Sequence, residues 1–210
     1  MPPTASRRPG RPPAAKADDT RKRILHAARQ VFSERGYDGA TFQAIAVRAD
    51  LTRPAINHYF SSKRVLYREV ADQTNELVVA PGIERAHRET TLMGRLSAFI
   101  TAALQANSEN PSASAFLVTN VLESQRHPEL KTAENDSVRI SREFLTWAVN
   151  DAIERSEVAT DIDVSALTET LLVVLCGVGF YAGYLGSREM EGVAEMLRQL
   201  LAGALWRPKA

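Results

Sequence analysis

The sequence has little of several features that would place it in a specialised class of protein. Its single cysteine, Cys176, excludes a disulfide framework within the chain and fits a reducing compartment. The longest apolar run, Leu171–Leu185, is shorter than the roughly 18 to 20 residues of a membrane span. The N-terminus is basic and rich in proline, and no apolar segment of a secretory signal follows it. We therefore expect a cytoplasmic protein without a membrane partner, in which 171–185 is a buried helix.

The charge is unevenly distributed, although the net charge of the 210 residues is only +1. Residues 1–70 contain 14 Lys+Arg and 6 Asp+Glu, whereas residues 71–210 contain 12 and 19. A basic first third indicates contact with a polyanion. A solvated basic tail on an otherwise ordinary protein would give the same pattern, so charge alone leaves both interpretations open.

Nearly the whole chain has the apolar spacing of α-helices, and no alternating strand pattern or Asn-Gly hairpin occurs. Four helices are predicted in the first 82 residues: 18–35 ending at Gly36, a short one from the Thr41 cap to Asp50, one capped by Thr52, and one from Ser61 or Ser62 to Val79. Ala80-Pro81-Gly82 is expected to end the fourth.

The second and third of these helices, joined by Ala49-Asp50-Leu51, predict a helix-turn-helix. Asp50 stands where the turn favours a left-handed backbone, which Asp tolerates better than most residues. On the third helix, Ile56 and Phe60 are sufficient for the core. The side chains left to face outward are Arg53, Ala55, Asn57, His58 and Tyr59. Their donors, acceptors and methyl groups suit the base edges and phosphates of a DNA major groove.

The stretch from Arg23 to Val70 resembles the DNA-binding domain of the TetR family of bacterial transcriptional regulators. It follows the family's order of a first helix ending at Gly-Tyr, a Thr, Ile-Ala, a turn, a cap, and a recognition helix closing on aromatic-Phe-x-x-Lys-x-x-Leu. Three positions depart from that pattern: Asp50 replaces the common turn Gly, Thr52 replaces Ser, and Asn57 stands where Tyr is commonest.

The resemblance implies an all-α fold in which an N-terminal three-helix helix-turn-helix domain is joined by a linking helix to a larger C-terminal helical domain for ligand binding and dimerisation. We expect a disordered basic arm at 1–17, the helix-turn-helix domain at 18–66 and the larger domain at 67–210.

The resemblance also implies DNA contacts for eight residues. These are phosphate contacts by Thr41 and Thr52, groove contacts by Arg53, Ala55, Asn57 and His58, and contacts to the backbone beside the groove by Tyr59 and Lys63. For Tyr59 the alternative is a half-buried ring packed on the first helix. For Lys63 it is an exposed lysine in the first turn of a helix, an unfavourable place for a cation.

The N-terminal arm contains Arg-Arg-Pro-Gly-Arg-Pro-Pro, which resembles the Gly-Arg-Pro core of an AT-hook, with Pro9 where such a hook has Arg. Arg8, Gly10 and Arg11 are the candidate contacts, because a narrow A·T minor groove attracts inserted arginine. The alternative is a tail that only improves solubility.

The C-terminal two thirds are expected to hold the ligand pocket and the dimer interface. Aromatic character and helix position indicate a pocket at Leu96, Phe99, Phe116, Phe144 and Trp147. A long helix carrying Phe144 and Trp147 is expected to begin at His127. Gly179 and Gly183, four residues apart, permit close helix approach and are assigned to the dimer interface with Leu197 and Leu201. Close packing inside one subunit is the alternative for the glycines.

Together these features predict a homodimeric, ligand-responsive transcriptional regulator, with a repressor as the first choice, that binds a palindromic operator in double-stranded DNA. A small apolar or amphipathic effector would release it. An activator of the same fold is the alternative, because the sign of regulation depends on where the operator lies relative to the promoter. The alternative class of function is a small-molecule-binding or enzymatic helical protein. However, residues 83–210 contain no polar catalytic constellation, and the four histidines have no metal-ligand spacing. We therefore expect no cofactor, no metal and no enzymatic activity.

Overall fold

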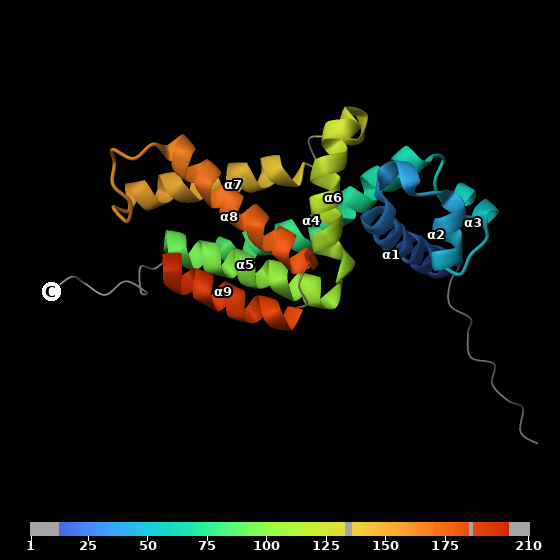
Figure 1. Cartoon of the computed structure of the whole chain (residues 1–210), viewed down its shortest axis with the longest axis horizontal. Coiled ribbons are helices and arrows are strands. Elements are labelled where there is room, and N and C mark those ends of the chain that lie inside the picture. Colours follow the sequence, from blue (N-terminus) through green and yellow to red (C-terminus); the bar gives the residue numbers. More distant parts are fainter. Residues whose placement is uncertain (1–12, 133–135, 185–186, 202–210) are drawn as a thin grey trace, which may run out of the picture.

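The computed structural model describes residues 13–132, 136–184 and 187–201. Within these ranges the chain forms α-helices, one short 3-10 helix and no strand, so the predicted all-α fold is confirmed. Figure 1 shows α1 to α3 gathered at one end of the molecule and α5, α7, α8 and α9 at the other, with α4 running between the two ends. The elements are α1 Pro13–Gly39, α2 Phe42–Arg48, α3 Arg53–Tyr59, α4 Lys63–Ala86, α5 Leu92–Glu109, α6 Ser112–Arg126, η1 Pro128–Leu130, α7 Ser137–Glu154, α8 Val164–Tyr184 and α9 Ser187–Leu201.

Two apolar cores hold these helices together, and α4 contributes to both. The first core joins α1, α2, α3 and the first half of α4 around Phe32, Ile56 and Tyr67, and Phe116 of α6 completes it. The second core joins the end of α4 with α5, α7, α8 and α9. One continuous helix therefore contributes side chains to both cores. Helix α4 also spans the boundary predicted between the helix-turn-helix domain and the larger domain at residues 66 and 67. That boundary stays a prediction.

Gly36 takes φ 67° and ψ −179°, so the first helix is interrupted at the residue where it was predicted to end, and a short further helical stretch runs to Gly39. The predicted end of the fourth helix at Ala80-Pro81-Gly82 was wrong. Helix α4 runs through Pro81 to Ala86. Pro81 fits the helix in φ, but it has no amide to donate to the Leu77 carbonyl and its ring crowds that carbonyl, which costs a helix about 3 kcal/mol. The next residue, Gly82, lets α5 approach closely, since a Cβ there would lie 2.8 Å from the Phe99 ring.

The long helix expected to begin at His127 is in fact two elements. Pro128–Leu130 forms a 3-10 turn, and α7 begins only at Ser137. Asp136 caps α7, because its Oδ1 accepts a hydrogen bond from the Arg139 amide at 3.1 Å. Its other oxygen, Oδ2, pairs with Lys131 Nζ at 2.8 Å. These local interactions lower the pKa of Asp136 against the opposing effect of burial, and they fix where α7 starts.

Helix α8 was expected to be buried, and this was wrong for the single chain. It is long and apolar enough to cross a bilayer, yet only 22% of its apolar window is buried. Leu171, Leu172 and Leu175 face the second core. Its outer side is exposed and apolar, and so is that of α9; the uncovered side chains are Val173, Phe180, Tyr181, Val193, Met196 and Leu200. We call these six residues the α8/α9 face.

Candidate nucleic-acid interface and effector cavity

The helix-turn-helix is built by two threonine caps, as its sequence predicted. Thr41 Oγ1 accepts a hydrogen bond from the Ala44 amide at 3.1 Å and begins α2. Thr52 Oγ1 accepts one from the Ala55 amide at 3.3 Å and begins α3. Both threonines are exposed. Each hydroxyl still has its own proton to donate, so both caps are free to donate to a phosphate oxygen.

The turn between α2 and α3 has the predicted left-handed residue. Asp50 takes φ 51°, and the following Leu51 amide donates to the Ala46 carbonyl at 2.9 Å. Leu51 packs against the first core. The Arg23 guanidinium of α1 donates to the Asp50 carbonyl at 3.0 Å and supports the turn from outside. These contacts fix the angle at which α3 projects from the domain.

Helix α3 presents a polar outer face above a buried inner one. Ile56 and Phe60 are 0% and 1% exposed. The side chains that project outward are Arg53, Asn57 and His58, with Ala55 half-buried. Tyr59 is also half-buried, packs against the first core and meets His58 edge to face at 5.4 Å. The tyrosine is thus half-buried, as its alternative supposed, and its contact with the DNA backbone stays a prediction.

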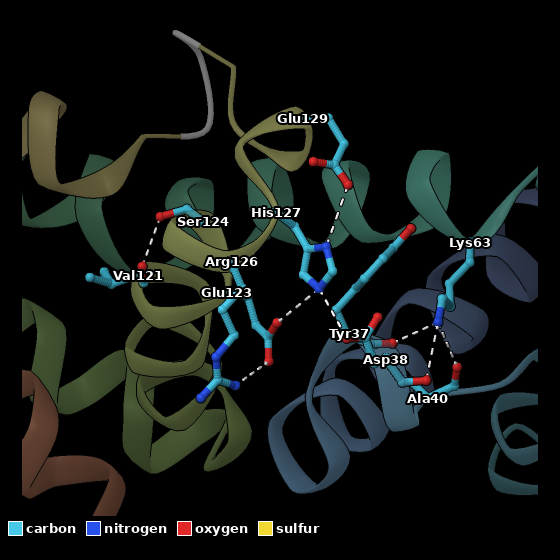
Figure 2. A network of polar contacts seen from close by, with 10 residues as sticks. All are labelled: Tyr37, Asp38, Ala40, Lys63, Val121, Glu123, Ser124, Arg126, His127 and Glu129. Carbon is cyan, nitrogen blue, oxygen red and sulfur yellow. Dashed lines mark hydrogen bonds and ion pairs between the residues drawn. The ribbon is translucent and has the colours of Figure 1, made fainter.

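Lys63 has a role that its sequence position did not reveal. Its ammonium donates to three carbonyl oxygens at the end of α1, those of Tyr37 at 2.7 Å, Asp38 at 3.4 Å and Ala40 at 3.2 Å, as Figure 2 shows. It also lies 4.4 Å from the centre of the Tyr37 ring. A cation at these carbonyls complements the negative end of the α1 dipole. The three carbonyl oxygens match the three N–H donors of the Lys63 ammonium. The phosphate contact of Lys63 stays a prediction.

A second polar cluster joins the helix-turn-helix domain to α6 (Figure 2). His127 Nε2 lies 3.1 Å from Asp38 Oδ2 and 3.8 Å from Glu123 Oε2, and its Nδ1 lies 3.5 Å from Glu129 Oε1. Its ring centre is 5.1 Å from that of Tyr37. We call this group around His127 the α1/α6 clasp. Glu123 is 5% exposed, so the clasp reaches into the domain junction.

A cavity of about 340 Å³ lies in the C-terminal part of the molecule, among α4, α5, α6, α7 and α8. Its walls are almost entirely apolar. The lining residues are Val78, Val79, Phe99, Ala103, Leu104, Ser114, Leu117, Val118, Val121, Leu122, Ser137, Val138, Ser141, Leu172, Leu175, Cys176, Val178, Gly179, Phe180 and Ala182. Helices α4 and α6, which both pack on the helix-turn-helix domain, thus also form walls of the cavity. Its size and lining are those of a small-molecule site.

A model of the family described as bacterial regulatory proteins, tetR family, matches residues 24–70, the stretch that forms the helix-turn-helix. The DNA-binding end of the chain thus matches the TetR family over the length of that model. SrpR, an HTH-type transcriptional regulator of Pseudomonas putida, is 29% identical over 201 residues, covering 92% of this chain and 86% of SrpR. UidR of Escherichia coli K12 is 26% identical over 162 residues, covering 77% of this chain and 81% of UidR.

Likeness to solved structures extends along the chain. The TetR family regulator PfmR from Thermus thermophilus superimposes with a TM-score of 0.69 at 25% identity, covering 88% of this chain and all of that one. The C-terminal helices therefore share the TetR fold with the DNA-binding end. Most of the length of the chain is therefore similar to TetR-family transcriptional regulators.

Of the five residues predicted to form the TetR-type ligand pocket, only Phe99 lines the cavity. Leu96 and Phe144 pack in the second core, and Phe116 lies in the first core against Phe32 and Tyr67. Aromatic character marks core packing as readily as a pocket, which is why these predictions missed the lining.

Trp147, the fifth predicted pocket residue, packs near the end of α4 and beside α5. Its ring lies 4.3 Å from the Arg95 guanidinium and 4.3 Å from the His87 ring. Arg95 is 2% exposed and pairs with Asp151 at 2.5 Å. This arrangement links α5 to α7, so Trp147 serves packing here.

The four predicted interface residues lie on α8 and α9 but in different surroundings. A Cβ on Gly183 would lie 3.1 Å from the Ala115 backbone of α6, so this glycine permits close packing inside the subunit, which was its alternative. Gly179 lines the cavity, and a Cβ added to it would meet no atom within 4 Å beyond its chain neighbours and its own helix backbone in the described residues. Leu197 packs on the second core. Leu201 ends α9, and its side chain lies outside the described residues, as do Arg8, Gly10 and Arg11 of the arm.

Proposed function

We propose that this chain is a cytoplasmic, homodimeric transcriptional repressor that binds a palindromic operator and is released by a small molecule. The observation that carries the proposal is the outer face of α3. Arg53, Asn57 and His58 project from a buried Ile56/Phe60 base, and the hydroxyls of Thr41 and Thr52 flank that face. Hydroxyls at the caps suit phosphates, and the Arg and Asn side chains suit base edges.

Dimerisation is supported by the α8/α9 face. Six large apolar side chains that are 40% to 70% exposed on two adjacent helices are unusual for a surface left in water. A second copy covering this face would bury them. Two copies would then hold their α3 helices about 34 to 36 Å apart, the spacing of successive major grooves.

Ligand response is supported by the continuity between the cavity and the DNA-binding end. Val78 and Val79 of α4 line the cavity, while Leu66, Tyr67 and Val70 of the same helix lie in the first core. A ligand that displaces this half of α4 therefore tilts the helix-turn-helix domain. A hundredfold loss of DNA affinity requires a coupling free energy of about 2.7 kcal/mol, which is within the usual range.

The experiment is selection of DNA fragments from the genome that encodes the chain, followed by gel shift on the fragments that bind. We expect a palindromic site, one dimer per site, and lower reporter expression when the chain is present. Higher expression would indicate an activator. Failure to bind any fragment more tightly than random DNA, or full affinity for the site as a monomer, would contradict the proposal.

A further inference from the structure

We propose that the effector is an uncharged, largely apolar molecule whose hydrogen-bonding group meets the hydroxyls of Ser114, Ser137 and Ser141. The inference rests on the proposed function, since it concerns the ligand of the same cavity. Its first ground is the chemistry of the lining. Among the twenty lining residues there is no Asp, Glu, Lys, Arg or His. A charged ligand group inside these walls would lose its hydration without gaining a partner.

The nearest side-chain charges do not provide that partner. Arg142 and Glu169 are close enough to act electrostatically on Cys176, a lining residue, but they do not line the cavity. They also satisfy each other, with Arg142 Nε 2.5 Å from Glu169 Oε1. Burial raises the pKa of the Cys176 thiol, so the cavity holds no thiolate at neutral pH either. An anionic ligand would have to displace Glu169 from Arg142 to gain a counter-ion.

The second ground is a set of free hydroxyls. Ser114, Ser137 and Ser141 are 3%, 8% and 9% exposed, and all three line the cavity. Ser137 and Ser141 are one turn apart on α7 and so share a face. Within the described part of the chain, no hydrogen bond joins any of these three hydroxyls to another residue. Hydroxyl groups can donate to or accept from a neutral carbonyl, amide or alcohol.

The test compares octanamide, octanoate and octylamine, which have the same chain length but different charge. Binding to the full-length protein is measured by calorimetry at neutral pH without DNA. We expect octanamide to bind at least about 100-fold more tightly than octanoate or octylamine, because the charged groups lose hydration that the walls do not replace. Ser137→Ala and Ser141→Ala should each weaken octanamide by about 2- to 10-fold.

A charge introduced at the cavity provides the matched control. Leu122 lines the cavity and is 58% exposed, so Leu122→Lys places an ammonium at an open edge of the cavity with little risk to folding. This variant should bind octanoate at least about 10-fold more tightly than the parent chain does. Thr101→Lys adds the same charge to an exposed position of α5 outside this cavity and should leave all three affinities unchanged.

Three results would overturn the inference: octanoate or octylamine binding as tightly as octanamide, no binding of octanamide, or an equal gain for octanoate in the Leu122→Lys and Thr101→Lys variants. DNA binding is measured separately by gel shift. A protein that prefers octanamide but has no operator would retain the inference about the cavity and lose the proposed function. A protein that binds an operator but prefers octanoate would retain the proposed function and lose the inference about the cavity.

Discussion

Arg53 and Asn57 lie one turn apart on α3 and therefore point to the same side of the helix. They are exposed, while Ile56 between them is fully buried. Base edges are read by side chains with more than one donor or acceptor, which arginine and asparagine have. His58 projects from the next position and packs against Tyr59. At the scale of single residues, Arg53 and Asn57 are thus our first candidates for sequence readout.

Replacing Arg53 by alanine is expected to cost about 1 to 3 kcal/mol of binding to the operator and to relax the preference at one base pair per half-site. The reason is that a base contact contributes only on the correct sequence. Affinities of the variant for all single-base operator changes provide the measurement. An equal loss on operator and random DNA would show that Arg53 contacts the phosphate backbone instead.

Lys63 is expected to contribute to stability, in contrast to Arg53. Lys63→Ala leaves three carbonyl oxygens at the end of α1 without their cation, so we expect the free energy of unfolding to fall by about 1 to 2 kcal/mol. Urea denaturation measures this. If Lys63 also contacts a phosphate, binding to operator and random DNA will weaken alike. Arg64→Ala removes a neighbouring exposed charge and is the control; an equal loss of stability there would refute the capping role.

At the scale of elements, two helices connect the cavity to the helix-turn-helix domain. Helix α4 is long enough to line the cavity with one half and to pack in the first core with the other. Helix α6 lines the cavity and contacts α1 at both of its ends. The Ser33 hydroxyl of α1 contacts the Ser112 carbonyl of α6 at 3.4 Å, and at the other end His127 meets Asp38 at 3.1 Å. Since α6 also lines the cavity, its position is set both by the cavity contents and by α1.

We expect His127→Ala to weaken the α1/α6 clasp and reduce the coupling between effector and DNA by about 0.5 to 2 kcal/mol. The operator affinity of the effector-free variant should change less than the ratio of affinities with and without effector. That ratio, measured by gel shift, is the readout. His26→Ala is the control, because this exposed histidine of α1 hydrogen-bonds to Gln30 of its own helix and does not belong to the clasp. An unchanged ratio for His127→Ala would exclude the clasp from the coupling.

At the scale of the whole molecule, charge and apolar surface are found at opposite ends. Helices α1 to α3 belong to the basic first third of the sequence and lie at one end, and the α8/α9 face lies on the C-terminal part (Figure 1). Such a separation suits a molecule that meets a polyanion at one end and another copy at the other. The association with DNA should then depend strongly on salt, because phosphate contacts release counterions.

Deleting residues 1–16 removes Arg7, Arg8, Arg11 and Lys16 and tests whether the arm adds to those contacts. If it does, operator affinity falls, and the slope of log affinity against log salt becomes shallower by about 0.9 for each phosphate that the protein no longer neutralises. Filter binding over a range of salt concentrations measures the slope. A slope equal to that of the full chain would show that the arm only solvates the protein.

The helix-turn-helix was predictable because its signals are local. Thr41 and Thr52 accept hydrogen bonds from amides three residues ahead, and Asp50 needs only its own backbone to fit the turn. Ile56 and Phe60 mark the buried side of α3 by their spacing alone. When two interacting residues are only three or four positions apart, their spacing in the sequence is enough to recognise the interaction. The sequence by itself therefore determined this domain and the family resemblance.

The remaining features depend on residues far apart in the chain, and only the tertiary structure decided them. Helix α4 continues past Pro81 to Ala86, and at Gly82 it packs closely against Phe99 of α5. Lys63 finds its carbonyl partners more than twenty residues away. The cavity is the space that five helices leave between them, so its lining follows from how those helices pack and not from the aromatic character of any one residue.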